Sequence, residues 1–292
     1  MQSLKPIVNS KKSKKCEGIF ILRDFLALPI FTLSTYDARR IIVAPFNGGE
    51  IMVDAHPDSR LPTQHDADVF IWLMNYVLKR QREGNFEYTV KVNLHRIMTD
   101  MGRGYNQKSY TIYRDSIIRL LSTRITFRKT RDYKKKGWSG GSFLSGIVYE
   151  NFEEIVFLDV DVPRWLFKIV QDPKSRLMVN RDYYRIVSNF EKRLYNVIRK
   201  LAGKDITHPG ICLRKLYDDY YGHGLYREFV ANIRKIVRRQ SIPDYWLKLQ
   251  YSPKRQDPYR LFFMHEIHLK GMGVDKHELN GLPLSICNGI GA

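Results

Sequence analysis

Two pairs of adjacent tyrosines are the residues whose type and spacing most directly suggest covalent chemistry. Tyr183-Tyr184 and Tyr220-Tyr221 offer phenolic hydroxyls that would attack a DNA phosphodiester, as in a nicking relaxase. Such an enzyme needs a metal held by a His-x-His pair, and the nearest arrangement is His265-Glu266-Ile267-His268. In a strand, the two histidines would face opposite sides and could not share a metal. We therefore expect no catalytic residue and no metal site, with a relaxase kept as a minor alternative.

Other catalytic and metal-binding patterns are missing from the sequence. No G-x-x-x-x-G-K-[ST] phosphate loop occurs, which argues against a P-loop ATPase. The three cysteines, Cys16, Cys212 and Cys287, are too few and too scattered for a disulfide framework or a zinc site. We expect a protein of a reducing cytoplasm that is not an enzyme and carries no cofactor.

The positive charge of the chain is strong and unevenly distributed. Its 292 residues include 49 Lys and Arg against 30 Asp and Glu, for a formal net charge of +19. Most of the excess falls in three segments, residues 1–15, 124–136 and 227–239. Such a charge favours a polyanionic partner, nucleic acid first and an anionic membrane surface second. The longest apolar stretch, Phe25 to Phe31, is far shorter than the ~20 residues of a membrane span.

The segment from Leu225 to Arg239 should form a helix with arginines opposite its apolar face. Helical periodicity places four apolar residues on one side: Leu225, Phe229, Ile233 and Ile236. Arg227, Arg234 and Arg238 fall on the other side. The planar fork of arginine matches phosphate oxygens and also the O6/N7 edge of guanine. We predict that these three arginines contact DNA; the alternative is a solvated face held by salt bridges.

The elements that would position this helix occur twice in the same order. The periodicity predicts a helix starting near Thr63, helices at 93–101 and 106–122, and strands at 124–128, 143–150 and 155–160. In the second half it predicts helices at 182–201, 211–221 and 225–239, then strands at 245–251 and 259–267. Two copies of helix, short helix, helix and β-hairpin are typical of tandem winged helix-turn-helix domains in an α+β fold.

Composition and element order together predict the domain organisation. We expect a basic flexible arm at 1–18 and an N-terminal winged-helix domain at 19–170. That domain would begin with a small β unit, because Asn47-Gly48 between two β-rich runs indicates a hairpin. A C-terminal winged-helix domain would follow at 175–270 and a tail at 271–292.

Further basic residues are candidates for DNA contact in the first half and in both hairpin tips. On the helix at 106–122, Lys108, Thr111 and Arg119 should lie on the exposed face. Asp115 would sit near phosphates there unless it pairs with Arg119. The remaining candidates are the predicted wing residues Arg128, Lys129, Arg131, Lys134, Lys135, Lys136, Lys254 and Arg255. For both the helix and the wings, the alternative is an ordinary solvated surface.

Several segments resemble a known family. They are Leu28-Pro29-Ile30-Phe31-Thr32-Leu33-Ser34, then Thr63-Gln64-His65-Asp66-Ala67-Asp68-Val69-Phe70, then Ser109-Tyr110 to Leu120-Leu121, and Thr123 to Phe127. In these segments, within about residues 20–165, the chain is similar to plasmid replication initiators of the replication initiator protein A type. The second half follows the family in outline, through Glu191-Lys192-Arg193-Leu194-Tyr195 and the basic third helix.

The resemblance implies what the protein does and with whom. It implies sequence-specific binding of double-stranded DNA at repeated origin sites, recruitment of host initiator and helicase proteins, and repression of its own promoter. It also implies a homodimer or a monomer–dimer equilibrium in which the first winged helix commonly serves dimerisation. We therefore expect a plasmid-associated initiator in the bacterial cytoplasm, without a membrane partner. A winged-helix transcription regulator is the second hypothesis.

Overall fold

The computed structural model describes residues 18–271 except positions 35, 47, 86, 88 and 105 and the segments 130–137, 151–154, 203–209 and 254–256. Some predicted sites lie outside these residues. They are the lysine-rich arm, the first basic tip (Arg131, Lys134, Lys135 and Lys136) and the second tip (Lys254 and Arg255). None of the described helices is long and apolar enough to cross a membrane.

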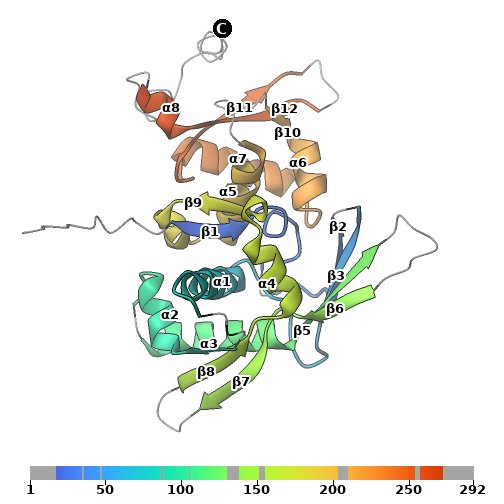
Figure 1. The fold of residues 1–292 in the computed structure, drawn as a ribbon. Coiled ribbons are helices and arrows are strands. Elements are labelled where there is room, and N and C mark those ends of the chain that lie inside the picture. The colour runs from blue at the N-terminus through green and yellow to red at the C-terminus, as the bar shows by residue number, and fades with distance from the viewer. Residues whose placement is uncertain are drawn as a thin grey trace, which may run out of the picture.

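The first half of the chain builds three helices and a three-stranded sheet (Figure 1). Its elements are α1 (Asp66–Arg82), β4 (Thr89–Val92), α2 (Leu94–Asp100), α3 (Gln107–Ser122), β7 (Ser145–Glu150) and β8 (Ile155–Asp161). The strands pair in the order β4-β8-β7. Asn93 and Asn106 begin α2 and α3, because their side chains accept hydrogen bonds from His95 N and Ser109 N.

The second half repeats this order. Its elements are α5 (Asn189–Ala202), β10 (Ile211–Cys212), α6 (Leu213–Tyr220), α7 (Tyr226–Arg239), β11 (Tyr245–Tyr251) and β12 (Tyr259–His265), followed by α8 (Glu266–Gly271). The strands pair in the order β10-β12-β11, which is the topology of the first half. The fold is therefore a mixed arrangement of helices and sheets in which helix, strand, helix, helix and hairpin occur twice.

A separate four-stranded sheet interrupts the first half, and here the sequence prediction was wrong. Strands β2 (Ile41–Phe46), β3 (Gly49–Ala55), β5 (Thr123–Lys129) and β6 (Trp138–Ser142) follow one another in the sheet. The sequence placed the basic tip of a wing between strands at 124–128 and 143–150, but these strands do not pair with each other. Instead β5 pairs with β3 and β6, and β7 pairs with β8. Glycine makes the β5–β6 pairing possible, because a Cβ at Gly140 would lie 2.7 Å from the Ile125 carbonyl oxygen. The β2–β3 hairpin predicted around Asn47-Gly48 is confirmed.

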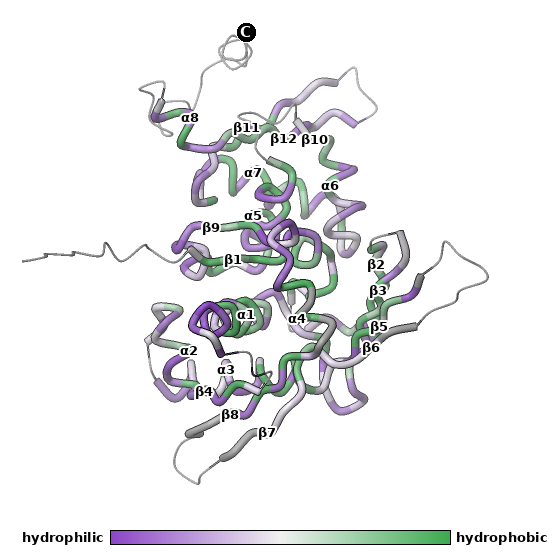
Figure 2. The backbone as a smooth tube through the Cα atoms, in the orientation of Figure 1, coloured by the Kyte–Doolittle hydropathy of each residue, from purple (hydrophilic) through white to green (hydrophobic). Residues whose placement is uncertain are grey.

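Strands from both ends of the first half join it to the second. β1 (Ile19–Leu22) pairs antiparallel with β9 (Arg176–Val179), and Figure 1 shows this pair lying between the two halves. The connection also contains α4 (Arg164–Gln171) and the 3₁₀ helices η1 (Pro173–Ser175) and η2 (Arg181–Arg185). One cluster of buried apolar side chains includes residues of both halves and many residues of α1. Figure 2 shows hydrophobic residues along α1.

Two buried cations of α5 also connect the halves. Lys192 donates to the carboxylate of Asp68 on α1, and neither side chain is exposed to solvent. The neighbouring Arg193 donates to the carbonyl of Phe31. Burial raises the pKa of Asp68 and lowers the pKa of Lys192, and the attraction between the two opposes both shifts. The packing of the two halves therefore depends on buried charged side chains as well as on apolar contacts.

Candidate nucleic-acid interface

Helix α7 presents a cationic surface to solvent. Phe229, Val230, Ile233 and Ile236 are buried, while Arg227, Arg234 and Arg238 are exposed, as the sequence predicted. Two more cations, Lys235 and Arg239, are exposed on the same helix. Leu225 does not belong to the apolar face, because it precedes the helix at the N-cap position and is 52% exposed.

Gln240 fixes this helix against the hairpin that follows it. It ends α7 in the left-handed conformation, with φ of 49°. Its side-chain amide donates to the Leu247 carbonyl at 2.7 Å and accepts from the Leu247 N–H at 2.9 Å. This paired contact with β11 sets the angle between the cationic helix and the hairpin. This contact could not be predicted from the sequence, since it depends on how the chain turns after α7.

Arg234 extends the cationic surface onto the hairpin. Its guanidinium donates to the Tyr259 hydroxyl on β12 and lies 5.0 Å from the centroid of that ring. Tyr259 in turn lies beside Tyr251 of β11, with ring centroids 5.0 Å apart. Arg234 is thereby oriented along the hairpin, whose basic tip at 254–256 lies outside the described residues.

Asp257, just after that tip, connects the tip end of the hairpin to α6. Its carboxylate accepts from the Arg214 N–H at 2.8 Å, from the Cys212 thiol and from the Tyr226 hydroxyl at 3.4 Å. Burial raises the pKa of Asp257, but these hydrogen bonds outweigh burial and hold the pKa below its usual value. This role of Asp257 was not predicted, because a carboxylate in a turn is usually just a solvated surface residue.

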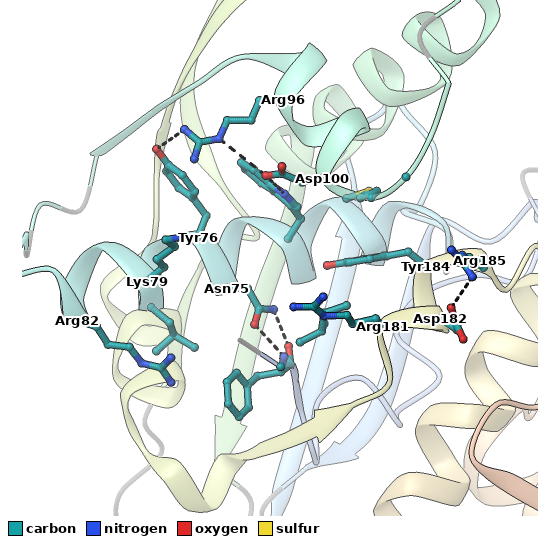
Figure 3. A pocket seen from close by; sticks show the side chains of 17 residues that line it. Asn75, Tyr76, Lys79, Arg82, Arg96, Asp100, Arg181, Asp182, Tyr184 and Arg185 are labelled. Carbon is teal, nitrogen blue, oxygen red and sulfur yellow. Dashed lines mark hydrogen bonds and ion pairs between the residues drawn. The ribbon is translucent and has the colours of Figure 1, made fainter. Parts of the chain in front are cut away.

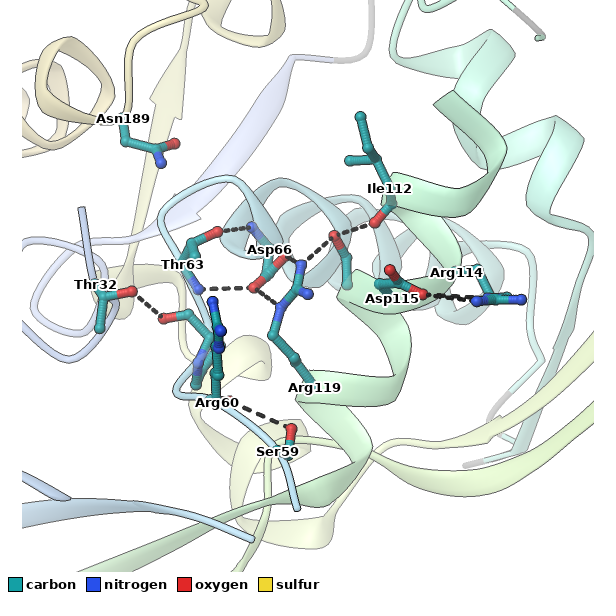
Figure 4. Close-up of polar contacts among 12 residues, drawn as sticks. Thr32, Ser59, Arg60, Thr63, Asp66, Ile112, Arg114, Asp115, Arg119 and Asn189 are labelled. Carbon is teal, nitrogen blue, oxygen red and sulfur yellow. Dashed lines mark hydrogen bonds and ion pairs between the residues drawn. The ribbon is translucent and has the colours of Figure 1, made fainter. Parts of the chain in front are cut away.

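The exposed face of α3 offers fewer cations than the sequence predicted. Lys108 is exposed and Thr111 is half-buried, with its hydroxyl donating to the Gln107 carbonyl at 3.0 Å. Arg119 was expected on this face and is instead held inside the domain (Figure 4). Its Nε and Nη2 atoms each lie 2.8 Å from a carboxylate oxygen of Asp66, which is fully buried at the start of α1. A buried carboxylate needs a cation, so Asp66 draws Arg119 away from the surface.

Asp115 also pairs differently from the prediction. It accepts from Arg114 at 3.2 Å, and not from Arg119. On β5, Arg128 lies 3.7 Å from Glu50 in an exposed pair, and Lys129 ends the same strand. The first half therefore presents Lys108 and Arg128 as cations on separate elements, in contrast to the continuous cationic surface of α7.

We predict that Arg119→Ala destabilises the fold without weakening DNA binding. Removing the guanidinium leaves Asp66 buried and unpaired, which should cost about 2–4 kcal/mol of unfolding free energy. Urea denaturation measures the loss, and DNA titration below the melting temperature measures the affinity of the folded protein. Lys108→Ala is the matched control on the same helix and should leave stability unchanged. If Arg119→Ala instead binds DNA more weakly and keeps its stability, Arg119 contacts the DNA.

The tyrosine pairs are poorly placed for nucleophilic attack. Tyr183, Tyr184 and Tyr221 are all at most 6% exposed. Burial raises the pKa of each hydroxyl above its ordinary value, which disfavours the reactive phenolate. Tyr220 is half-buried, and burial raises its pKa as well. In this environment the tyrosines serve as aromatic packing between α5, α6 and η2.

The two C-terminal histidines were wrongly assigned to a single strand. His265 ends β12, whereas His268 lies in α8, and their ring centroids are 6.3 Å apart. The two histidines therefore do not lie on opposite faces of one strand, as had been predicted. In the described part of the chain, no three His, Cys, Asp or Glu side chains gather as metal ligands would.

Comparison with known families identifies the chain. Residues 23–247, well over half of the sequence, match the profile of the replication initiator protein A family. The chain belongs to this family of replication initiators. The initiator is also 24% identical over 256 residues to the "Putative replication protein" of Wigglesworthia glossinidia brevipalpis, covering 80% of the initiator and 90% of that relative.

Solved structures agree with the fold of the initiator. Two crystal structures of domains 2 and 3 of RctB superpose with TM-scores of 0.61 and 0.57. Each match covers 80% of the initiator, and the matches cover 95% and 94% of the RctB chains. The sequence identities are only 13% and 12%, so the similarity concerns the arrangement of elements.

Proposed function

We propose that the protein initiates plasmid replication by binding repeated double-stranded DNA sites at an origin. The observation that carries the proposal is the cationic surface of α7, where Arg227, Arg234 and Arg238 are exposed opposite a buried apolar face. A helix in this position of a winged helix enters the major groove. The two topological repeats act as tandem winged helix-turn-helix domains, with α7 reading bases and the β11–β12 hairpin holding phosphates.

The first repeat contributes to DNA binding in a different way from the second. Lys108 and Thr111 of α3 approach an adjacent groove, and Arg119 supports them by neutralising Asp66 within the domain. By topology the β7–β8 hairpin takes the position of the wing. The basic segment 130–137, which lies outside the described residues and connects β5 to β6 in the chain, adds phosphate contacts. Because its cationic surface is weaker, the first repeat serves dimerisation. The protein recruits host initiator and helicase proteins and represses its own promoter. It catalyses no reaction itself.

The salt dependence of binding tests the electrostatic part of the proposal. If about eight phosphates are neutralised, log K should fall with log salt with a slope near −7. Fluorescence anisotropy with a labelled origin repeat, from low to physiological salt, measures this slope. If log K hardly changes with log salt, duplex DNA is excluded as the ligand.

A plasmid assay separates initiation from simple transcriptional regulation. A plasmid that carries the origin but lacks the gene should be maintained only when the protein is supplied in trans. DNA binding with no support of plasmid maintenance would favour the transcription regulator instead. A covalent tyrosine–DNA adduct trapped with Mg²⁺ or Mn²⁺ would favour the relaxase.

A further inference from the structure

A pocket lies at the junction of the two halves, away from α7. It has a volume of about 510 Å³ and is bounded by β1, α1, α2 and η2 (Figure 3). Ile19, Phe20 and Met101 are among its apolar lining residues. Asn75 of α1 holds β1 in place there, because its side chain exchanges two hydrogen bonds of 2.8 Å with the backbone of Phe20. The pocket is therefore formed before any ligand arrives.

The rim of this pocket has more cations than its carboxylates can neutralise. Its two carboxylates are already paired, Asp100 with Arg96 at 3.8 Å and Asp182 with Arg185 at 2.9 Å. Arg82 and Arg181 also line the pocket, and within the described part of the chain neither has a carboxylate partner. Figure 3 shows Arg82 on α1 and Arg181 on η2.

A third arginine increases the excess of positive charge beside Phe20. The guanidinium carbons of Arg82 and Arg176 lie 5.6 and 5.5 Å from the centroid of the Phe20 ring. The pKa of Arg176 is lowered by burial and by the neighbouring charge of Arg82, and its Nε is buried without a hydrogen-bond partner. Two like charges held around one ring, one of them incompletely solvated, would be stabilised by an anion.

The chemistry of the lining favours a peptide over nucleic acid. A partly exposed aromatic ring of the lining, Tyr76, already has Trp72 stacked on it, with ring centroids 5.0 Å apart, and the Arg96 guanidinium 4.8 Å from its centroid. It therefore offers little platform for a nucleobase. Duplex DNA would meet the cations with phosphates but would leave the apolar lining unused. An acidic peptide with an apolar side chain matches both the cations and the lining.

We propose that this pocket binds an acidic segment of a partner protein through Arg82 and Arg181, with an apolar side chain of that segment inserted beside Phe20. The proposal deepens the proposed function, since it gives an initiator that recruits host proteins a docking site distinct from its DNA surface. Because the pocket needs β1 and α1 together with η2, it exists only when the connection between the halves packs against α1 as in this structure.

Fluorescence anisotropy with synthetic peptides and the full-length chain tests this inference. The probes are fluorescein-labelled peptides of about a dozen residues: an Asp/Glu-rich peptide with a central Leu-Phe, the same peptide with Ser-Ser in its place, and a Lys-rich version with Leu-Phe. We expect binding of the first, about ten-fold weaker binding of the second, and no binding of the third. Equal binding of the first two, or no binding of the first, would overturn the proposal.

A pair of charge-matched variants locates the binding site. Arg82→Glu with Arg181→Glu should weaken binding of the acidic Leu-Phe peptide by about ten-fold or more. Arg124→Glu with Lys270→Glu makes the same change in net charge at exposed positions and should leave binding within about two-fold. Equal losses in both variants would show attraction by net charge alone and would overturn the proposal.

Duplex binding by the same variants separates the peptide from nucleic acid. Both variants should bind a labelled origin repeat equally well. A selective loss of duplex binding in Arg82→Glu with Arg181→Glu would assign the pocket to DNA and overturn the peptide proposal. If the wild-type protein binds no DNA at all, the proposed function fails while the peptide titrations still decide whether the pocket binds an acidic segment.

Discussion

Replacing Arg227, Arg234 and Arg238 together by alanine should abolish sequence-specific binding to origin DNA. An arginine that holds a guanine edge contributes about 1–3 kcal/mol, so three losses amount to about 3–9 kcal/mol of binding free energy. The margin between specific and non-specific binding is typically about 4–10 kcal/mol. The triple variant should therefore bind an origin repeat little better than a scrambled duplex. Anisotropy titrations on both duplexes at one fixed salt concentration measure this margin.

The control for this variant removes the same charge elsewhere. Replacing the exposed lysines Lys79, Lys174 and Lys270 by alanine should lower affinity for both duplexes only slightly and leave their ratio unchanged. The three arginines of α7 are exposed, so both triple variants should keep their melting temperature within a few degrees. If the α7 variant weakens both duplexes equally, the arginines hold phosphates and do not read bases. If it weakens neither, α7 is not the DNA-binding helix.

Lys192→Met should be among the most destabilising single changes in the chain. It leaves Asp68 without its cation at a site where neither side chain is exposed. An unpaired buried charge typically costs about 3–5 kcal/mol of unfolding free energy, a large part of the stability of a protein of this size. Urea denaturation followed by circular dichroism measures the loss. Because Asp68 lies on α1 and Lys192 on α5, proteolysis between the two halves should also become faster.

The double variant Asp68→Leu with Lys192→Met decides whether charge is the cause. With both charges removed, apolar side chains replace the pair, and most of the lost stability should return. If the double variant is as unstable as Lys192→Met, the loss comes from altered packing around α5 and not from an unpaired carboxylate. A Lys192→Met variant with wild-type stability would show that Asp68 is protonated and the pair carries no charge.

Features that depend on local sequence were predicted well. The helices at 93–101, 106–122 and 225–239 and the strand at 245–251 occur within about two residues of their predicted bounds. Each has a short-range signal, such as an Asn cap or an apolar face that repeats every three to four residues. The exposed arginines of α7 were predicted for the same reason, since one helical turn fixes which side chains share a face.

Features that depend on contacts distant in sequence were predicted poorly. Arg119 has the spacing of a surface residue on α3, yet it pairs with Asp66, 53 residues earlier. The partners of β5 and β6 were misassigned because alternating apolar residues do not specify which strand lies alongside. The short strands β1 and β9 and the helix α4 were not predicted, since the two strands pair with each other from distant parts of the chain and α4 packs against α1.

The sequence by itself determined the family, the repeated order of elements and the cationic face of α7. These follow from residue types at short spacing, where the geometry of a helix or hairpin leaves few alternatives. Only the tertiary structure decided which cations remain at the surface. A buried carboxylate such as Asp66 or Asp68 pairs with a cation that is near in space, and that cation can be far away in the sequence. It also created the pocket beside Phe20, whose lining comes from segments more than a hundred residues apart along the chain.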